Sequence, residues 1–440
     1  MAQEKPKFQP LRSLGVLEKY LVKRSRIGVY QKVAITARYR CRNIKTLRPA
    51  LFAALAAVIS KHPSLSVTSV DVDSGVPYFA RLPIIDLDKI ITFTEFDELA
   101  DQHGRFPALD ALLAHEHTQA WEYMSLPLWR MHVLQNRGNF SEFILCYFFH
   151  HCIGDTKSAL VLHQAVETAL NDSLEREPVS VVDTPDLPLL PPLEALRGLA
   201  ERNGSENQEQ SLHIWSGAVQ HLPVQTKVTS LWLSQEETTG LLQVSKYHGV
   251  SLTATLEAML VAALFTHVPP DYTTIKSDCA VSLRQWLPNP INADSMGVFV
   301  DTFFMTHERA PFTWEEARRI KNRIDQVMQE KGGDGLLEKL SRIADFESWM
   351  KGKMGRRRTT SLELSNVGHL GPSQADKDYQ IESLLFSQSA GASSGAIKVS
   401  AVSGRDGRLT LGFSWQEGVV ENQVVQDVVR EFHRILDDQI

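Results

Sequence analysis

Cysteine is scarce in this sequence, and its spacing is irregular. The 440 residues include four cysteines, which lie far apart and form no Cys-x-x-Cys pair: Cys41, Cys146, Cys152 and Cys279. Structural zinc sites and disulfide frameworks need cysteines at close, characteristic spacings. The sequence therefore predicts buried free thiols, with no metal site and no disulfide framework.

Long apolar runs and an excess of basic charge are also missing. No apolar run approaches the roughly 18 residues of a membrane-spanning helix, and the opening stretch MAQEKPKFQPLRSLGVLEKY lacks the apolar core of a secretory signal. Lysine and arginine number 46 against 52 aspartates and glutamates, whereas nucleic-acid binding needs a basic face. We therefore expect a soluble cytoplasmic protein with no membrane span and no nucleic-acid partner.

Apolar residues make up 43% of the chain, which is enough to bury a large core. Helical and strand-like periodicities mix in both halves, and the stretches 11–24 and 336–353 are among those with helical spacing. Between the halves, five prolines from 178 to 192 and a polar run interrupt the pattern. We therefore predict an α+β protein with an N-terminal domain over 1–175, a linker over 176–211 and a C-terminal domain over 212–440.

The stretch SEFILCYFFHHCIGDTKS (141–158) places His150, His151 and Asp155 after an apolar strand. The strand is apolar on both faces, as in the middle of a covered sheet, and its alternation sends the two histidine rings to opposite faces. A neutral imidazole held through Nδ1 leaves Nε2 free as a general base. Asp155 either caps the following helix or forms a buried ion pair. From these residues alone, a catalytic and a purely structural set both remain open.

Four further stretches follow in a fixed order. They are LRSLGVLEKYLVKRSRIGVYQ (11–31), AVSLRQWLP (280–288), MGVFVDTF (296–303) and LELSNVGHLGP (362–372). With HHCIGDTKS, they resemble the chloramphenicol acetyltransferase-like and condensation-domain superfamily, whose signature is HHxxxD. The opening stretch is similar to fungal alcohol acetyltransferases, and the DFGWG segment of plant BAHD acyltransferases is absent. The resemblance runs from about residue 11 to 437.

This resemblance implies two α/β sandwich subdomains of the chloramphenicol acetyltransferase type, arranged pseudo-symmetrically with a tunnel between them. It also implies that His151 is the catalytic base and that Asp155 forms a structural ion pair with Arg284. By the same match, His150 serves in packing or positioning.

The chain departs from the family pattern at two positions. Asp301 stands where asparagine is usual, and Thr156 stands where relatives often have glycine. A β-branched residue there either narrows the site or alters the hydrogen bond to the acyl carbonyl. Gly154 is retained, and glycine permits a close approach of the backbone to substrate.

Two more groups of residues are candidates for substrate contacts. Attack on a thioester forms an oxyanion that needs hydrogen-bond donors nearby, and Ser365 and Asn366 are candidates unless they only end a strand. Five basic residues fall between 351 and 358. Lys351, Lys353 and Arg356 of this group either bind the phosphates of coenzyme A or belong to a solvated loop.

The sequence therefore predicts an acyl-CoA-dependent O-acyltransferase, and within that class an acetyltransferase, acting as a monomer on a small or medium apolar alcohol or secondary metabolite. It needs no permanently bound cofactor, because acetyl-CoA or another acyl-CoA is a co-substrate that supplies the driving force. Two alternatives remain open. One is an enzyme that takes its acyl group from a carrier protein, and the other is a non-catalytic binding protein of the same fold.

Overall fold

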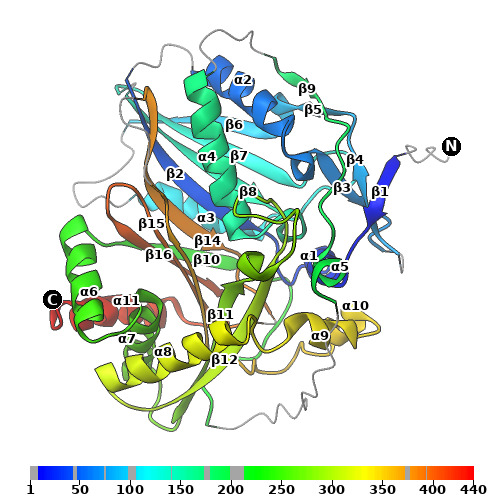
Figure 1. The fold of residues 1–440 in the computed structure, drawn as a ribbon. Helices are drawn as coiled ribbons and strands as arrows, with labels where there is room; N and C mark the ends of the chain where they lie inside the picture. Colours follow the sequence, from blue (N-terminus) through cyan, green and yellow to red (C-terminus); the bar gives the residue numbers. More distant parts are fainter. Residues whose placement is uncertain are drawn as a thin grey trace.

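The computed structural model describes residues 8–42, 47–73, 76–97, 106–139, 141–172, 179–198, 213–371, 377–392 and 394–440. Two lobes, each built on one large sheet, lie one above the other (Figure 1). The upper sheet in this view has the strand order β14 (Tyr379–Gln388), β2 (Val33–Cys41), β8 (Glu142–Phe149), β7 (Trp129–Asn136) and β6 (Ile91–Phe96). The lower sheet has the order β10 (Thr226–Trp232), β16 (Leu409–Gln416), β15 (Ile397–Ser403), β13 (Leu362–His369), β11 (Thr274–Ser282) and β12 (Val300–Glu308). The mixed α/β character predicted from the sequence is confirmed.

Strand β8 is the central strand of the N-terminal sheet, and every residue after Glu142 in it is buried. Helix α4 (Thr156–Asp172) packs on β2 and against helix α2 (Leu47–Ile59), so these helices cover one face of the sheet. Helix α3 (Pro107–Thr118) contributes to a separate apolar cluster with Ile144 and Phe148, which point to the other face. The continuous apolar run of β8 thus reflects helices on both faces.

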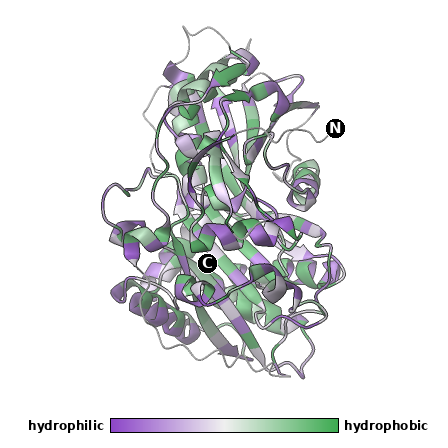
Figure 2. Ribbon diagram, turned by 90° about the vertical axis from the view of Figure 1, so that its right-hand side faces the viewer, coloured by the Kyte–Doolittle hydropathy of each residue, from purple (hydrophilic) through white to green (hydrophobic). Residues whose placement is uncertain are grey.

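The C-terminal sheet is covered on one face by helix α7 (Leu252–His267), which packs against α8 (Trp314–Gln329) and α11 (Asn422–Asp437). Helix α6 (Gln235–Tyr247) lies beside α7. The strands of both lobes are mainly hydrophobic, whereas the outer helices carry many hydrophilic residues (Figure 2). In the described part of the chain no single helix is both long and apolar enough to cross a bilayer. The pair α6 and α7 passes that test by length and composition, but bends by 102°.

One strand crosses from the C-terminal half into the N-terminal lobe. Strand β14 pairs antiparallel with β2, with Gln388 opposite Val33 and Tyr379 opposite Cys41. It follows β13 and precedes β15, which are both strands of the other sheet. The two lobes are therefore joined by hydrogen-bonded backbone as well as by the linker.

Residues 179–198 of the predicted linker lie along the N-terminal lobe. Strand β9 (Val181–Asp183) pairs with β5 (Ile84–Asp86), and α5 (Leu193–Arg197) follows. The Val16 N–H donates to Glu194 Oε1 at 2.8 Å, which ties this segment to the start of α1 (Val16–Arg26). The remaining linker positions, 176–178 and 199–211, lie outside the described residues, and the domain boundaries stay predictions.

Two helices expected from the sequence have different bounds. The stretch 11–24 begins in strand β1 (Gln9–Ser13), which pairs with β4 (Tyr78–Arg81) beside β3 (Val67–Val70). The stretch 336–353 divides into α9 (Leu336–Ser341) and α10 (Phe346–Lys351). It divides because Asp345 caps α10, accepting hydrogen bonds from the N–H groups of Glu347 and Ser348.

Candidate active site

The HHxxxD motif forms the turn between the central strand β8 and helix α4. His150 is 1% exposed. Its Nδ1 accepts a hydrogen bond from the Cys152 N–H at 3.0 Å, so the proton lies on Nε2, which is 3.0 Å from the Tyr123 hydroxyl oxygen. Burial lowers the pKa of His150 well below its ordinary value. Both ring nitrogens are thus already engaged within the protein.

His151 opens the short 3-10 turn His151–Ile153 and has one engaged nitrogen. Its Nδ1 lies 3.1 Å from the Gly154 carbonyl oxygen. A carbonyl only accepts, so Nδ1 carries the proton and Nε2 keeps its lone pair. Burial and the nearby Arg24 charge lower the pKa of His151 to about 4. The ring is therefore neutral near pH 7 and lines a cavity of about 430 Å³.

Asp155 is 2% exposed and pairs with Arg284 of the other lobe. Two parallel contacts join them, Arg284 Nη1 to Oδ2 at 2.6 Å and Nη2 to Oδ1 at 2.8 Å. The carboxylate also accepts from the backbone N–H groups of Ser158 and Phe299, each at 3.1 Å. Burial alone would raise the pKa of Asp155, but Arg284 and these hydrogen bonds lower it overall. Asp155 thus caps α4 and forms a buried ion pair at once.

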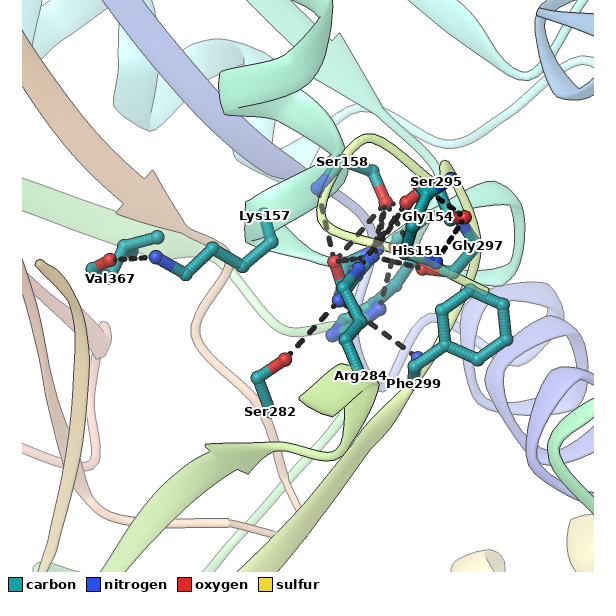
Figure 3. A network of polar contacts seen from close by, with 12 residues as sticks. His151, Gly154, Lys157, Ser158, Ser282, Arg284, Ser295, Gly297, Phe299 and Val367 are labelled. Atoms are coloured by element: carbon teal, nitrogen blue, oxygen red, sulfur yellow. Dashed lines mark hydrogen bonds and ion pairs between the residues drawn. The ribbon is translucent and has the colours of Figure 1, made fainter. Parts of the chain in front are cut away.

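Arg284 extends this network to the loop before β12 (Figure 3). Its guanidinium donates to the Ser295 and Gly297 carbonyls at 3.1 and 3.2 Å and to Ser158 Oγ at 3.1 Å. Ser158 Oγ in turn accepts from the Gly297 N–H at 3.1 Å. A side-chain carbon on Gly154 would lie 2.9 Å from Ser158 Cβ, so packing against Ser158 requires glycine at this position. Gly154 is not among the residues that line the cavity, and its part in a close approach to substrate stays a prediction.

The cavity beside His151 is lined by residues from both lobes. The N-terminal half contributes Thr156 and Lys157, and the C-terminal half contributes Ser365 of β13 and its neighbour Asn366. The Asn366 side chain donates to Thr253 Oγ1 at 3.0 Å and accepts from the Gly368 N–H at 2.9 Å, at the irregularity in the pairing of β13 with β15. The Lys157 ammonium donates to the Val367 carbonyl at 2.5 Å, which links α4 to β13 across the cavity.

The basic residues between 351 and 358 point in different directions. Lys353 lines the cavity and lies 3.6 Å from the Trp349 ring centroid. Lys351 is exposed and pairs with Glu347 at 2.6 Å, and Arg356 is exposed. Arg358 is 5% exposed and donates to the Gly391 carbonyl at 2.6 Å. The stretch therefore does not form a single anion-binding patch.

Polar residues that the sequence interpretation missed line the same cavity. They are Arg24, Tyr30, Asp278, Glu363, Gln388 and Lys398. The Arg24 guanidinium lies 3.9 Å from the Tyr30 ring centroid, and the Tyr30 hydroxyl donates to Gln388 Oε1 at 3.1 Å. The signal in the sequence was the presence of acidic and basic side chains inside otherwise apolar strands, as in IKSDCAVS and AIKVSAVS.

One group of side chains among the described residues could hold a metal ion by its spacing, and it lies away from the cavity. Glu237, His433 and Asp437 meet where α6 and α11 come together at the surface. His433 Nε2 already contacts Glu237 Oε1 at 2.5 Å. Nothing else in this group points to a bound ion.

Comparisons with known proteins agree with this arrangement. The family model for alcohol acetyltransferases matches residues 13–184 and 204–440. Two fungal relatives are described as probable alcohol acetyltransferases. crmB of Aspergillus fumigatus is 28% identical over 93% of this chain and 96% of its own length, and FCK4 of Fusarium pseudograminearum is 22% identical over 85% and 83%.

Solved structures share the fold at lower identity. TRI3, a trichothecene 15-O-acetyltransferase of Fusarium sporotrichioides, superposes with a TM-score of 0.71 at 14% identity, covering 97% of this chain and 94% of its own. The first condensation domain of the CDA synthetase gives a TM-score of 0.68 at 13% identity, with 97% of each chain covered. Since the family model covers most of the sequence, this chain is an acyltransferase that belongs to the alcohol acetyltransferase family.

Proposed function

We propose that this protein is an acyl-CoA-dependent O-acetyltransferase with a small or medium alcohol or secondary metabolite as acceptor and His151 as general base. The observation that carries the proposal is the hydrogen bond between His151 Nδ1 and the Gly154 carbonyl. It fixes the tautomer that leaves Nε2 unprotonated, in a ring that lines a cavity of about 430 Å³. A cavity of this size accommodates a small-molecule acceptor.

The chemistry that follows uses one histidine in two steps. His151 Nε2 takes the proton of the acceptor hydroxyl as its oxygen attacks the thioester carbonyl carbon. The resulting tetrahedral oxyanion collapses, the ester forms, and the carbon–sulfur bond breaks. The departing coenzyme A thiolate takes the proton back from Nε2, so the histidine returns to its starting state.

Oxyanion contacts come from donors that face the cavity. Ser365 lines it, and Asn366 uses one of its two amide hydrogens on Thr253, which leaves one hydrogen for an oxyanion. Thr156 also lines the cavity, where a glycine would offer no hydroxyl group. We propose Ser365, Asn366 and Thr156 as the side chains to examine for this role.

The test compares His151→Ala with His115→Ala, which removes an exposed histidine of α3. With acetyl-CoA and a straight-chain alcohol, free thiol and ester are measured together. We expect His151→Ala to lower kcat by about 10²- to 10⁴-fold and His115→Ala to leave it unchanged. Near wild-type turnover in His151→Ala would overturn the base assignment. If acetyl transfer occurs only with a carrier-bound donor, a carrier protein and not coenzyme A is the donor. If the acceptor binds but no thiol is released from any donor, the protein is a binding protein and not an enzyme.

A further inference from the structure

Three charged side chains from neighbouring strands form one row on the sheet face that lines the cavity. Asp278 of β11 is opposite Glu363 of β13, and Glu363 is opposite Lys398 of β15. Directly opposed residues project from the same face of a sheet. All three line the cavity, so the C-terminal sheet presents a polar row in a cavity whose other walls include apolar side chains.

Two members of this row form an ion pair, whereas the third has a carboxyl oxygen without a hydrogen-bond partner among the described residues. Lys398 Nζ donates to Glu363 Oε2 at 2.8 Å, and the lysine is 2% exposed. Asp278 is 8% exposed, and its Oδ1 has no hydrogen-bond partner among the residues that the structure describes. Buried polar atoms without a partner are rare in folded proteins and cost stability. Oδ1 itself is fully buried, so a bound molecule would reach this carboxyl group through the part of Asp278 that lines the cavity.

The charge around Asp278 defines what such a partner can be. Burial and the neighbouring Glu363 carboxylate raise the pKa of Asp278 well above its ordinary value, which favours the uncharged carboxyl group with a hydrogen to donate. The Glu363–Lys398 pair adds no net charge. An anionic ligand group would face Glu363, and a cationic one would face Lys398. The row therefore suits an uncharged oxygen.

The row lies at a distance from the catalytic turn. Ser282, near the Arg284 network, is four residues along β11 from Asp278, which corresponds to about 13 Å along an extended strand. A bound molecule that extends along β11 from beside the Arg284 network to Asp278 is therefore longer than a small alcohol. The Tyr30 ring lies near both the catalytic turn and the row, with its centroid 6.4 Å from that of His151 and 4.8 Å from Lys398 Nζ.

We propose that Asp278, beside the Glu363–Lys398 pair, binds a second, uncharged hydroxyl or carbonyl oxygen of the acceptor. The preferred acceptors would then carry at least two oxygen functions separated by a long carbon frame, and the second oxygen would fix which hydroxyl reaches His151. This inference rests on the proposed acetyl transfer and adds a substrate class to it.

The test measures binding without any donor, so that no turnover occurs. Decan-1-ol and decane-1,10-diol differ only in the second hydroxyl, and a ten-carbon chain is of the right length to span the two positions. By calorimetry, we expect wild-type protein to bind the diol about tenfold more tightly than the mono-alcohol, after correction for the two equivalent ends of the diol. Asp278→Leu should abolish this preference, because leucine offers no hydrogen bond.

Two matched variants control the result. Asp278→Asn keeps a neutral donor of nearly the same shape and should retain the preference. Asp271→Leu, at an exposed position shortly before β11, should also retain it. Because the Asp278 carboxyl is buried and unpartnered, Asp278→Leu should keep or raise Tm relative to wild type. If Asp278→Leu does not fold, Asp278→Ala, which also removes the hydrogen-bond donor, takes its place and should likewise abolish the preference.

Equal affinity of wild type for the two probes would overturn the proposal, and so would a diol preference that survives in Asp278→Leu. A change confined to the KM for acetyl-CoA would overturn it by placing Asp278 on the donor. A failure of the proposed acetyl transfer can be distinguished from a failure of this subsite. If the diol preference is present but no thiol is released from acetyl-CoA, the subsite stands and the acetyl transfer does not.

Discussion

The two lobes bury their histidines in different electrostatic surroundings. Among the described residues, the N-terminal lobe has five buried or half-buried histidines whose pKa values burial lowers: His62, His117, His150, His151 and His163. In the C-terminal lobe, His307 is 1% exposed. Burial would lower its pKa too, but contacts with Glu257 and Glu316 raise it. Burial alone favours the neutral ring, whereas carboxylate neighbours favour the charged one.

This difference explains what the Asp155–Arg284 pair contributes to His151. The charge of Asp155 acts to raise the pKa of His151, as the two glutamates do for His307. Burial and the Arg24 charge outweigh this effect and keep the pKa of His151 low. Arg284, 2.6 Å from Asp155, neutralises that carboxylate, so the ion pair joins the lobes without adding net charge beside the proposed base.

The largest expected effect comes from breaking this pair. Arg284→Leu leaves Asp155 buried and uncompensated, which should lower the free energy of unfolding by about 3 to 5 kcal/mol. It should also raise the pH at which kcat/KM is lost in acid, because Asp155 then acts on His151 without opposition. Urea unfolding and a pH–rate profile measure the two effects.

A double variant controls the Arg284 prediction. Asp155→Asn combined with Arg284→Leu removes the lone charge, so part of the lost stability should return. If the single and double variants unfold at the same urea concentration, an uncompensated charge is not the cause of the instability.

The second prediction compares how pH changes the stability contributed by one buried histidine in each lobe. The pKa of His163 is about 4 in the folded protein against about 6.5 unfolded, so its contribution to stability falls as pH drops from 6.5 toward 4. His163→Gln should flatten this acid slope by about 1 to 2 kcal/mol. His307 has the opposite sign, because its raised pKa stabilises fully below pH 6.5 and the contribution is lost as pH rises through the folded value. His307→Gln should therefore flatten the alkaline side.

Urea unfolding between pH 4.5 and 9 measures both slopes in one series. His115→Ala, at an exposed position of α3, serves as the control and should follow the wild-type curve. An unchanged acid slope in His163→Gln, or a flattened acid slope in His307→Gln, would contradict the contrast between the lobes.

The smallest expected effect concerns the basic stretch. Lys351 and Glu347 form an exposed pair, so Lys351→Ala should change the free energy of unfolding by less than about 0.5 kcal/mol and leave the KM for acetyl-CoA unchanged. Lys353→Ala, at a residue that lines the cavity, should raise that KM severalfold. A rise in KM for Lys351→Ala alone would show that the donor lies along the outer surface of α10.

The sequence was sufficient for features that depend on neighbouring residues. The covered strand β8 follows from its continuous apolar run, and the turn after it follows from the HHxxxD spacing. The pairing of Asp155 with Arg284 came from the family resemblance, because 129 residues separate them and no local pattern relates them. Local capping was missed at Asp345, where a favourable N-cap interrupts an otherwise continuous helical pattern.

The sequence shows Asp278, Glu363 and Lys398 one by one, but it does not predict that they form a row. Each residue interrupts the apolar pattern of its own strand, and a single such residue has no distinctive meaning. The row exists only because β13 lies between β11 and β15 in that register. Strand order and register are set by packing of the whole lobe, so the subsite becomes visible only in the folded chain.

Because β14 comes from the C-terminal half of the chain but belongs to the N-terminal sheet, cutting the chain in the linker would separate this strand from its sheet. A fragment ending in the linker would expose the unpaired edge of β2, and such edges favour aggregation. The complementary fragment would hold β14 with no sheet to join. Neither piece should fold alone, but the two expressed together should reassemble by strand donation, much as a split reporter does. Acetyl transfer recovered on mixing would then report contact between any two partners fused to the fragments.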